Sequence, residues 1–232
     1  LVDPQNEQDS KMPDKYIVVD FETTGLKPGF RPVEIAWLEF DDEFNILESV
    51  SSLINPQIEI ERGAQAVHGI SQEMVQDAPT LDEFITGVHG DPFRRSEVLV
   101  VAHNAKFDFP IIAPFCGLAT RLCTLELAWA IYPEAPNHKL NTLANFCAID
   151  KVPNHRALDD IETCFALLQH FAKKTTNSLL ELLEFSHDFE AISIMPFGKH
   201  KGSAIKDLPN DYKKWLFENF ESNDWIIQVL KS

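Results

Sequence analysis

The sequence predicts an α/β fold around a mixed β-sheet, followed by a small separate unit at its C-terminal end. Three observations predict it: three strand-like segments at short spacing within residues 16–54, a continuous apolar run at 97–102, and helical patterns interleaved after that run. With 232 residues and 44% hydrophobic content, the chain can fill one medium core and a smaller one.

The early segments predict an antiparallel meander. Residues 16–21 form a β-branched run, residues 33–40 alternate between apolar and polar, and residues 46–54 follow an acidic turn at 41–43. Such short connections favour neighbouring antiparallel strands.

The later segments predict a central strand and helices. Thr80 and Glu83 form a capping box that opens a helix, and the run 97–102 is typical of a strand buried on both faces. Further helices are expected at residues 104–115, 122–131, 141–148 and 179–185, with a long amphipathic helix that begins near residue 156 and ends before 173–178.

Composition excludes several protein classes. No apolar run approaches the roughly 18 residues of a membrane span, and the polar segment 1–14 lacks an apolar signal core, so we expect a cytoplasmic protein. The four cysteines lack paired CxxC spacing, which argues against a zinc knuckle or a disulfide framework.

The formal net charge is −16. Phosphate binding usually draws on clustered Lys and Arg, so this balance lowers the expectation of tight non-specific nucleic-acid binding. It does not exclude phosphodiester chemistry, because a site for divalent cations needs surplus carboxylates and bound metal reverses the local field.

Two acids follow the first strand in the stretch VVDFETTGL (18–26). Asp20 and Glu22 are two residues apart, so both project from one face, about 7 Å apart along the strand. They could be surface acids at a strand end. The tight turn that follows, with Leu26 exposed beside them, favours a cation site instead.

A third acid follows the buried strand in VVAHNAKFD (100–108). If the helix begins near Asn104, Asp108 lies one turn later and shares its face. Asp108 could alternatively only stabilise the helix N-terminus through the dipole.

A fourth acid lies in NHRALDDI (154–161). Asp160 aligns with Cys164, Leu167 and Phe171 on the apolar stripe, whereas Asp159 belongs to the more polar face with Thr163. Because an unpaired buried charge is costly, metal ligation explains Asp160 best.

His155 cannot share a regular helix face with Asp160, so we expect it on the loop that enters the helix, turned toward the site. On its own, a loop histidine is more often a surface residue than a catalyst.

Taken together, DFETTGL, HNAKFD and HRALDD, with AVHGIS at 66–71 between them, resemble the motifs of the DEDDh exonucleases in order and spacing over about residues 15–171. The resemblance implies a ribonuclease-H-like fold, with a mixed five-stranded sheet and helices on both sides, over an exonuclease domain at 15–175.

The resemblance also implies roles for these residues. Two Mg²⁺ or Mn²⁺ ions would be held by Asp20, Glu22, Asp108 and Asp160. His155 would be the general base that takes the proton of the attacking water, and the reaction would release nucleoside 5′-monophosphates from a 3′ end. Leu26 would wedge against the terminal base. The other residues implied in the nucleotide pocket are Thr24, His68, His103 and Phe107, although Phe107 could simply pack in the core.

The C-terminal segment differs in charge. After a linker at 176–194, residues 195–214 carry five lysines and two aspartates, a net charge of +3, within a small basic domain at 195–232. The stretch FGKHKG resembles the C-terminal domain of the exodeoxyribonuclease X subfamily, which implies DNA contacts by Lys199 and Lys201 and a role in DNA repair. A solvated surface segment would have the same composition.

Other functions remain open on the sequence. The chain could trim RNA 3′ ends, act as a proofreading subunit of a polymerase, or be an inactive nucleic-acid-binding or protein-interaction module. The intact acids and His155 argue against an inactive module, since a binder gains nothing from mutually repelling carboxylates.

Overall fold

The computed structural model describes residues 13–88, 93, 96–151, 153–187, 195, 198–220, 226 and 230. Most of the expected polar tail and residues 188–194 of the expected linker lie outside these ranges. Within the part of the chain that the structure describes, no helix combines the length and apolarity that crossing a bilayer requires.

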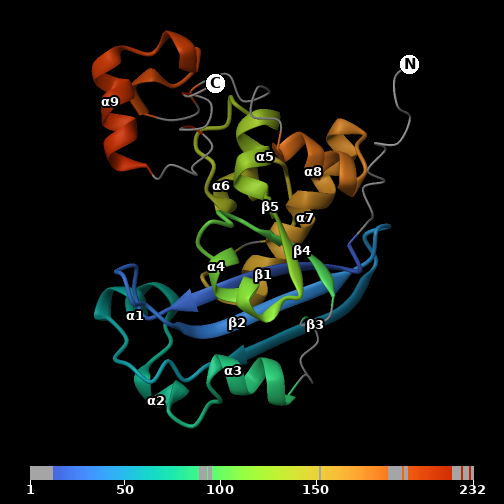
Figure 1. Cartoon of the computed structure of the whole chain (residues 1–232), viewed down its shortest axis with the longest axis vertical. Helices are drawn as coiled ribbons and strands as arrows, with labels where there is room; N and C mark the ends of the chain where they lie inside the picture. The colour runs from blue at the N-terminus through green and yellow to red at the C-terminus, as the bar shows by residue number, and fades with distance from the viewer. Residues whose placement is uncertain are drawn as a thin grey trace, which may run out of the picture.

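A five-stranded mixed sheet with the strand order β3-β2-β1-β4-β5 forms the centre of the fold (Figure 1). The strands β1 (Lys15–Thr23), β2 (Pro32–Phe40) and β3 (Ile46–Leu53) form the antiparallel meander that the sequence predicts. β4 (Glu97–Ala102) pairs parallel with β1 on one side and β5 (Leu118–Cys123) on the other, so β4 is the buried strand that its apolar run predicts.

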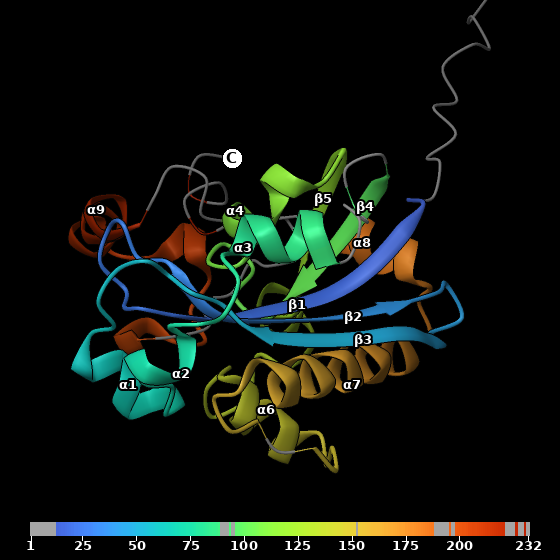
Figure 2. The same ribbon diagram turned by 90° about the horizontal axis from the view of Figure 1, so that it is seen from below.

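Two layers of side chains cover the sheet. The even-numbered residues of β1 and β2 point toward α7 (Ala157–Thr175) and α5 (Thr124–Ile131), and the odd-numbered residues point toward α3 (Leu81–Glu83), η1 (Phe84–Val88) and α4 (Phe109–Ile112). Figure 2 shows α7 and α3 on opposite faces of the sheet. The remaining described elements are α1 (Arg62–His68), α2 (Gln72–Val75), η2 (Ala113–Phe115), α6 (Leu140–Phe146), α8 (Leu179–His187), η4 (Gly198–His200), η5 (Ile205–Asp207) and α9 (Asn210–Asn219).

The expected helices at 104–115 and 122–131 are both wrong in part. Asn104 has a left-handed backbone (φ 69°), and the helix begins only after Asp108, which places Pro110 in its first turn. Proline is tolerated there but would break the interior of a helix that began at residue 104. Leu122 and Cys123 belong to β5, because parallel pairing with β4 overrides their local helical pattern.

The apolar stripe of α7 is confirmed, with Cys164, Leu167 and Phe171 all buried. Thr163 was expected on the polar face but is also fully buried. Its hydroxyl donates to the Asp159 carbonyl at 2.8 Å, which satisfies the hydroxyl inside the helix. The helix also continues to Thr175, past the point where the sequence suggested a break.

The C-terminal segment has a small core of its own that rests on α5. Buried Met195, Ile205, Leu208, Tyr212 and Leu216 pack with Trp129 and Ala130 of α5. Helix α8, within the expected linker, packs its leucines into the main core instead. Figure 1 shows α9 set apart from the sheet, on the side of α5 and α6.

Candidate active site

The end of β1 brings Asp20 and Glu22 to the α7 face of the sheet. Both continue the even-numbered series of Tyr16 and Val18, which are buried against that helix. The strand is irregular between Glu22 and Thr23, where its pairing with β2 shifts by a residue. Both carboxylates are half-buried.

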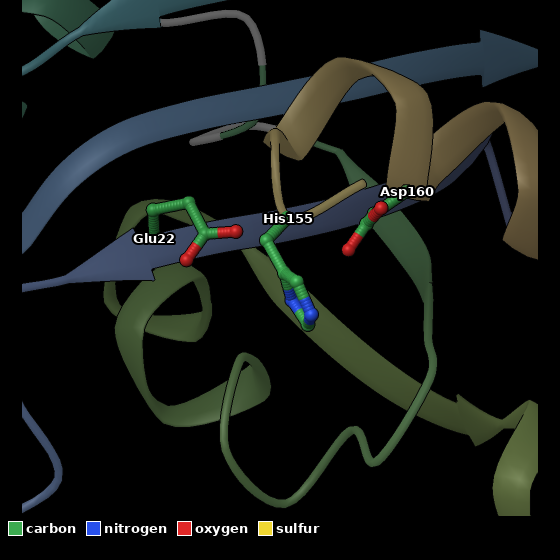
Figure 3. A group of neighbouring side chains, drawn as sticks. All are labelled: Glu22, His155 and Asp160. Atoms are coloured by element: carbon green, nitrogen blue, oxygen red, sulfur yellow. The ribbon is translucent and has the colours of Figure 1, made fainter. Parts of the chain in front are cut away.

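α7 and the loop before it supply Asp160 and His155. One carboxylate oxygen of Glu22, one of Asp160 and one ring nitrogen of His155 all lie within 4.8 Å of one another. Figure 3 shows the imidazole of His155 between the two carboxylates. The loop position of His155 is the one expected from the sequence, with a left-handed backbone (φ 61°).

Asp108 reaches the same cluster from the loop after β4. It is 3% exposed, and its carboxylate accepts a backbone hydrogen bond from Phe21, the residue between the two β1 acids. Asn104 is not its helical neighbour, since residues 104–108 form turns. Asp108 therefore lies beside β1 because of these turns, and not because of an i, i+4 helical relation to Asn104.

Electrostatics show that the four carboxylates share one site. Burial, followed by the charges of Asp160 and Glu34, raises the pKa of Asp20 to about 8. Burial and then the charge of Asp20 raise the pKa of Glu22 to about 8. The pKa values of Asp108 and Asp160 are also raised, in both cases chiefly by burial.

This donor set fits divalent cations. Besides burial, the charge of Asp160 raises the pKa of Asp20, and the charge of Asp20 raises the pKa values of Glu22 and Asp108. Full ionisation of these carboxylates near neutral pH is therefore unfavourable unless a cation lies among them. Carboxylate oxygens are the ligands that Mg²⁺ and Mn²⁺ prefer. Asp20, Glu22, Asp108 and Asp160 could together hold such ions.

The residues implied in the nucleotide pocket lie in different environments. Leu26 is 83% exposed on the turn after β1. Phe107 is half-buried and stacks on Phe30 of that turn, with ring centroids 4.9 Å apart. Thr24 is buried, and its hydroxyl accepts a hydrogen bond from the Arg31 amide at 3.0 Å.

The two pocket histidines are tied into the protein. His68 Nε2 donates to the Thr23 carbonyl at 3.2 Å, and Nδ1 accepts from the Ile70 amide at 3.0 Å. His103 Nε2 donates to the His138 carbonyl at 2.9 Å, and Nδ1 lies 3.0 Å from Thr124 Oγ1. Burial lowers the pKa of His103 to about 4, so this ring is neutral at physiological pH.

A cleft of about 900 Å³ opens beside the carboxylates. His155 and Asp160 lie at one part of its lining, and Trp129, Lys139 and Lys201 at others, so the C-terminal segment forms part of the wall. Lys201 Nζ also donates to the Ala135 carbonyl of the main domain. Lys199 is placed over the Tyr212 ring, 5.3 Å from its centroid.

Two side chains at the site were not singled out from the sequence. Glu34 of β2 is 4% exposed, and Arg156 pairs with it. The available signal was an acid between Val33 and Ile35 in a largely apolar strand, where a buried charge requires a partner.

Comparisons with known proteins agree with this geometry. A sequence model of the family described as Exonuclease (RNase_T) matches residues 17–168. A second, named for a quorum-sensing-regulated virulence factor, matches residues 189–221. Exodeoxyribonuclease 10 from Escherichia coli (strain K12) is 29% identical over 213 residues, which cover 88% of this chain and 91% of that protein.

The chain spans only a small part of some of its relatives. The PolC-type DNA polymerase III of Caldanaerobacter subterraneus subsp. tengcongensis is 33% identical over 185 residues, which cover 77% of this chain but 12% of the polymerase. A solved structure of exonuclease X in complex with 5′ overhanging duplex DNA superimposes with a TM-score of 0.59 at 26% identity, covering 74% of this chain and 99% of that one. The chain therefore belongs to the DEDDh family of 3′–5′ exonucleases.

Proposed function

We propose that this chain is a metal-dependent 3′–5′ exodeoxyribonuclease that releases nucleoside 5′-monophosphates from DNA 3′ ends. The observation that carries the proposal is the meeting of four carboxylates and His155 at one edge of the sheet. DNA as substrate is supported by similarity to exodeoxyribonuclease 10 and to an exonuclease X bound to duplex DNA. A role in DNA repair is part of the same proposal.

Asp20, Glu22, Asp108 and Asp160 would hold two Mg²⁺ or Mn²⁺ ions. Such ions, when bound, would supply Lewis-acid activation of the attacking water and neutralise the charge on the leaving 3′-oxygen. The carboxylates must be ionised to hold these ions. Without a cation, burial and the repulsion between neighbouring carboxylates disfavour their ionised forms.

His155 would act as the general base. Its imidazole lies between the carboxylates of Glu22 and Asp160 (Figure 3), and histidine is the side chain that most often acts as a general base. The water oxygen bonds to phosphorus as the bond from phosphorus to the 3′-oxygen breaks, and the water proton passes to His155.

The cleft next to His155 would receive the terminal nucleotides. Leu26, almost fully exposed, is positioned to wedge against a base, and Phe107 offers a ring beside the same turn. His103 lines this cleft, whereas Thr24 and His68 are not among its lining residues. All three would shape the nucleotide pocket as side chains held by hydrogen bonds within the protein. Lys201, which lines the cleft, and Lys199, which lies over the Tyr212 ring, would contact the phosphates.

Time courses with matched 3′-labelled DNA and RNA, single- and double-stranded, in Mg²⁺ and in EDTA, test this proposal. We expect mononucleotide release from DNA in Mg²⁺ and none in EDTA. Equal or faster release from RNA would contradict the DNA assignment, and full activity in EDTA would contradict the metal-dependent mechanism.

A further inference from the structure

Glu34 is a fifth carboxylate at the edge of the acidic cluster. It lies opposite Glu22 in the pairing of β1 with β2, so the two side chains share the α7 face. It is 4% exposed. A buried like charge beside the cluster is unfavourable unless a cation compensates it.

Among the residues that the structure describes, the side-chain hydrogen bonds of Glu34 lead to the start of α7. Arg156 Nε lies 3.2 Å from Oε1 and 3.1 Å from Oε2, and Arg156 Nη2 donates to Oε1. The backbone N–H of Ala157, the first residue of the helix, donates to Oε2 at 3.0 Å. Glu34 thus caps α7 from a neighbouring strand, where the planar fork of arginine fixes the geometry more tightly than a lysine would.

His155 immediately precedes this junction and has an unusual backbone. Its φ of 61° lies in the left-handed region, which a non-glycine residue keeps only when its surroundings hold it there. On one side, the Asn154 amide donates to Asp160 Oδ1 at 3.1 Å. On the other side, Arg156 and Ala157 are bound to Glu34. The backbone is therefore anchored on both sides of His155.

From these contacts, we infer that the Glu34–Arg156 pair positions His155 for catalysis. The inference rests on the proposed role of His155 as general base. A base must lie within hydrogen-bonding reach of the proton it takes, so a loop free to relax its left-handed turn would move the imidazole out of reach. Arg156 is then a positioning residue that acts through His155.

Two other roles for Arg156 would change different measured quantities. Its side chain is 45% exposed, so it could bind a substrate phosphate, which would appear in KM. It could also contribute only to folding, which would appear in the melting temperature and not in the turnover of the folded enzyme.

A kinetic double-mutant cycle separates these roles. The variants are Arg156→Ala, His155→Ala and the double variant, all made in the full chain. Single-turnover rates and steady-state KM are measured on DNA, and Mn²⁺ binding and the melting temperature are measured by calorimetry without DNA. Because Arg156→Ala leaves Glu34 buried and unpaired and could prevent folding, Arg156→Lys is measured in both backgrounds as well. It keeps the charge but loses the fork.

In the wild-type background we expect the rate to fall about 10- to 100-fold, with KM and Mn²⁺ affinity nearly unchanged. In the His155→Ala background the same substitutions should have little further effect, since the residue through which they act is gone. Equal losses in both backgrounds, or a loss confined to KM, would overturn the inference. Lys151→Ala is the matched control, because it breaks an exposed ion pair to Glu162 between the same loop and helix and should leave the rate unchanged.

Wild-type activity in the His155→Ala variant itself would instead refute the proposed role of His155 as general base. Arg156 would then have no catalytic residue to position. The cycle therefore distinguishes failure of the proposed function from failure of this inference.

Discussion

Glu22 on β1 lies directly opposite Glu34 on β2, yet the two carboxylates have different surroundings. Glu22 faces Asp160 and His155, whereas both oxygens of Glu34 are bound by Arg156 and Ala157. Arg156 also lowers the pKa of Glu22, against the stronger effects of burial and of the neighbouring acids. One acid of the pair is thus left for a metal, and the other secures the loop that carries the proposed base.

The first prediction concerns the metal ligands. Asp20→Ala and Asp160→Ala should each reduce turnover by orders of magnitude without unfolding the protein, because each removes a carboxylate from the centre of the cluster. Single-turnover rates in Mg²⁺, with circular dichroism to check the fold, measure this.

Asp159→Ala is the matched control on the adjacent position of the same helix. Asp160 is among the charges that raise the pKa values of Asp20 and Glu22, whereas Asp159 is not, so the loss of Asp159 should change turnover little. If Asp159 and Asp160 proved equally essential, the assignment of Asp160 rather than Asp159 to the active site would be wrong.

The second prediction concerns His155. His155→Ala should lower the rate about 10²- to 10⁴-fold, the usual contribution of a general base, while Mn²⁺ affinity is largely kept because all four carboxylates remain. Stopped-flow rates and calorimetric Mn²⁺ titrations check the two parts. A collapse of Mn²⁺ affinity would make His155 a metal ligand instead, since its ring nitrogen lies within 4.8 Å of both carboxylates.

The third prediction concerns stability and pH without metal. Folded Asp20 and Glu22 have pKa values of about 8, whereas unfolded carboxylates titrate near pH 4. Between these values the folded state binds more protons than the unfolded state, so these groups make stability fall as pH rises through this window. We expect the Tm in EDTA to decrease from about pH 5 to pH 8, and Mn²⁺ to raise the Tm more at the higher pH.

Asp20→Asn, measured by calorimetry beside the wild type, isolates this contribution. The variant lacks one repelling carboxylate, so its Tm in EDTA should depend less on pH than that of the wild type. Identical pH slopes for the two proteins would show that the carboxylates are not forced together as the structure indicates.

The sequence predicted the strands that carry the acids because β1, β2 and β4 have strong local patterns that agree with their burial. It did not predict β5, because an edge strand owes its conformation to pairing with β4 more than to its own residues. Asp108 was selected by its motif, but its helical relation to Asn104 was wrong since Pro110 forces a late helix start.

The Glu34–Arg156 pair illustrates a further limit. The two residues are 122 positions apart, and nothing local to either indicates the other. Only the antiparallel register, which places Glu34 beside Glu22, together with the packing of α7 on β1 and β2, brings them into contact.

The last prediction concerns the C-terminal lysines, which the structure divides into two kinds. Lys201 Nζ donates to the Ala135 carbonyl and Lys213 Nζ donates to the Lys206 carbonyl, so both also hold the protein together. Lys199 lies over the Tyr212 ring, and Lys214 forms an exposed ion pair of 3.8 Å with Glu218. If these two lysines contact DNA phosphates, Lys199→Ala and Lys214→Ala should each reduce the slope of log Kd against log salt by about one unit, with hydrolysis of a very short substrate unchanged. Lys201→Ala should in addition slow the short substrate, because it loosens the wall of the cleft. Fluorescence anisotropy over a salt series, on catalytically blocked Asp20→Asn protein, measures the slopes; unchanged slopes in both single variants would mean that the basic segment serves a partner other than DNA.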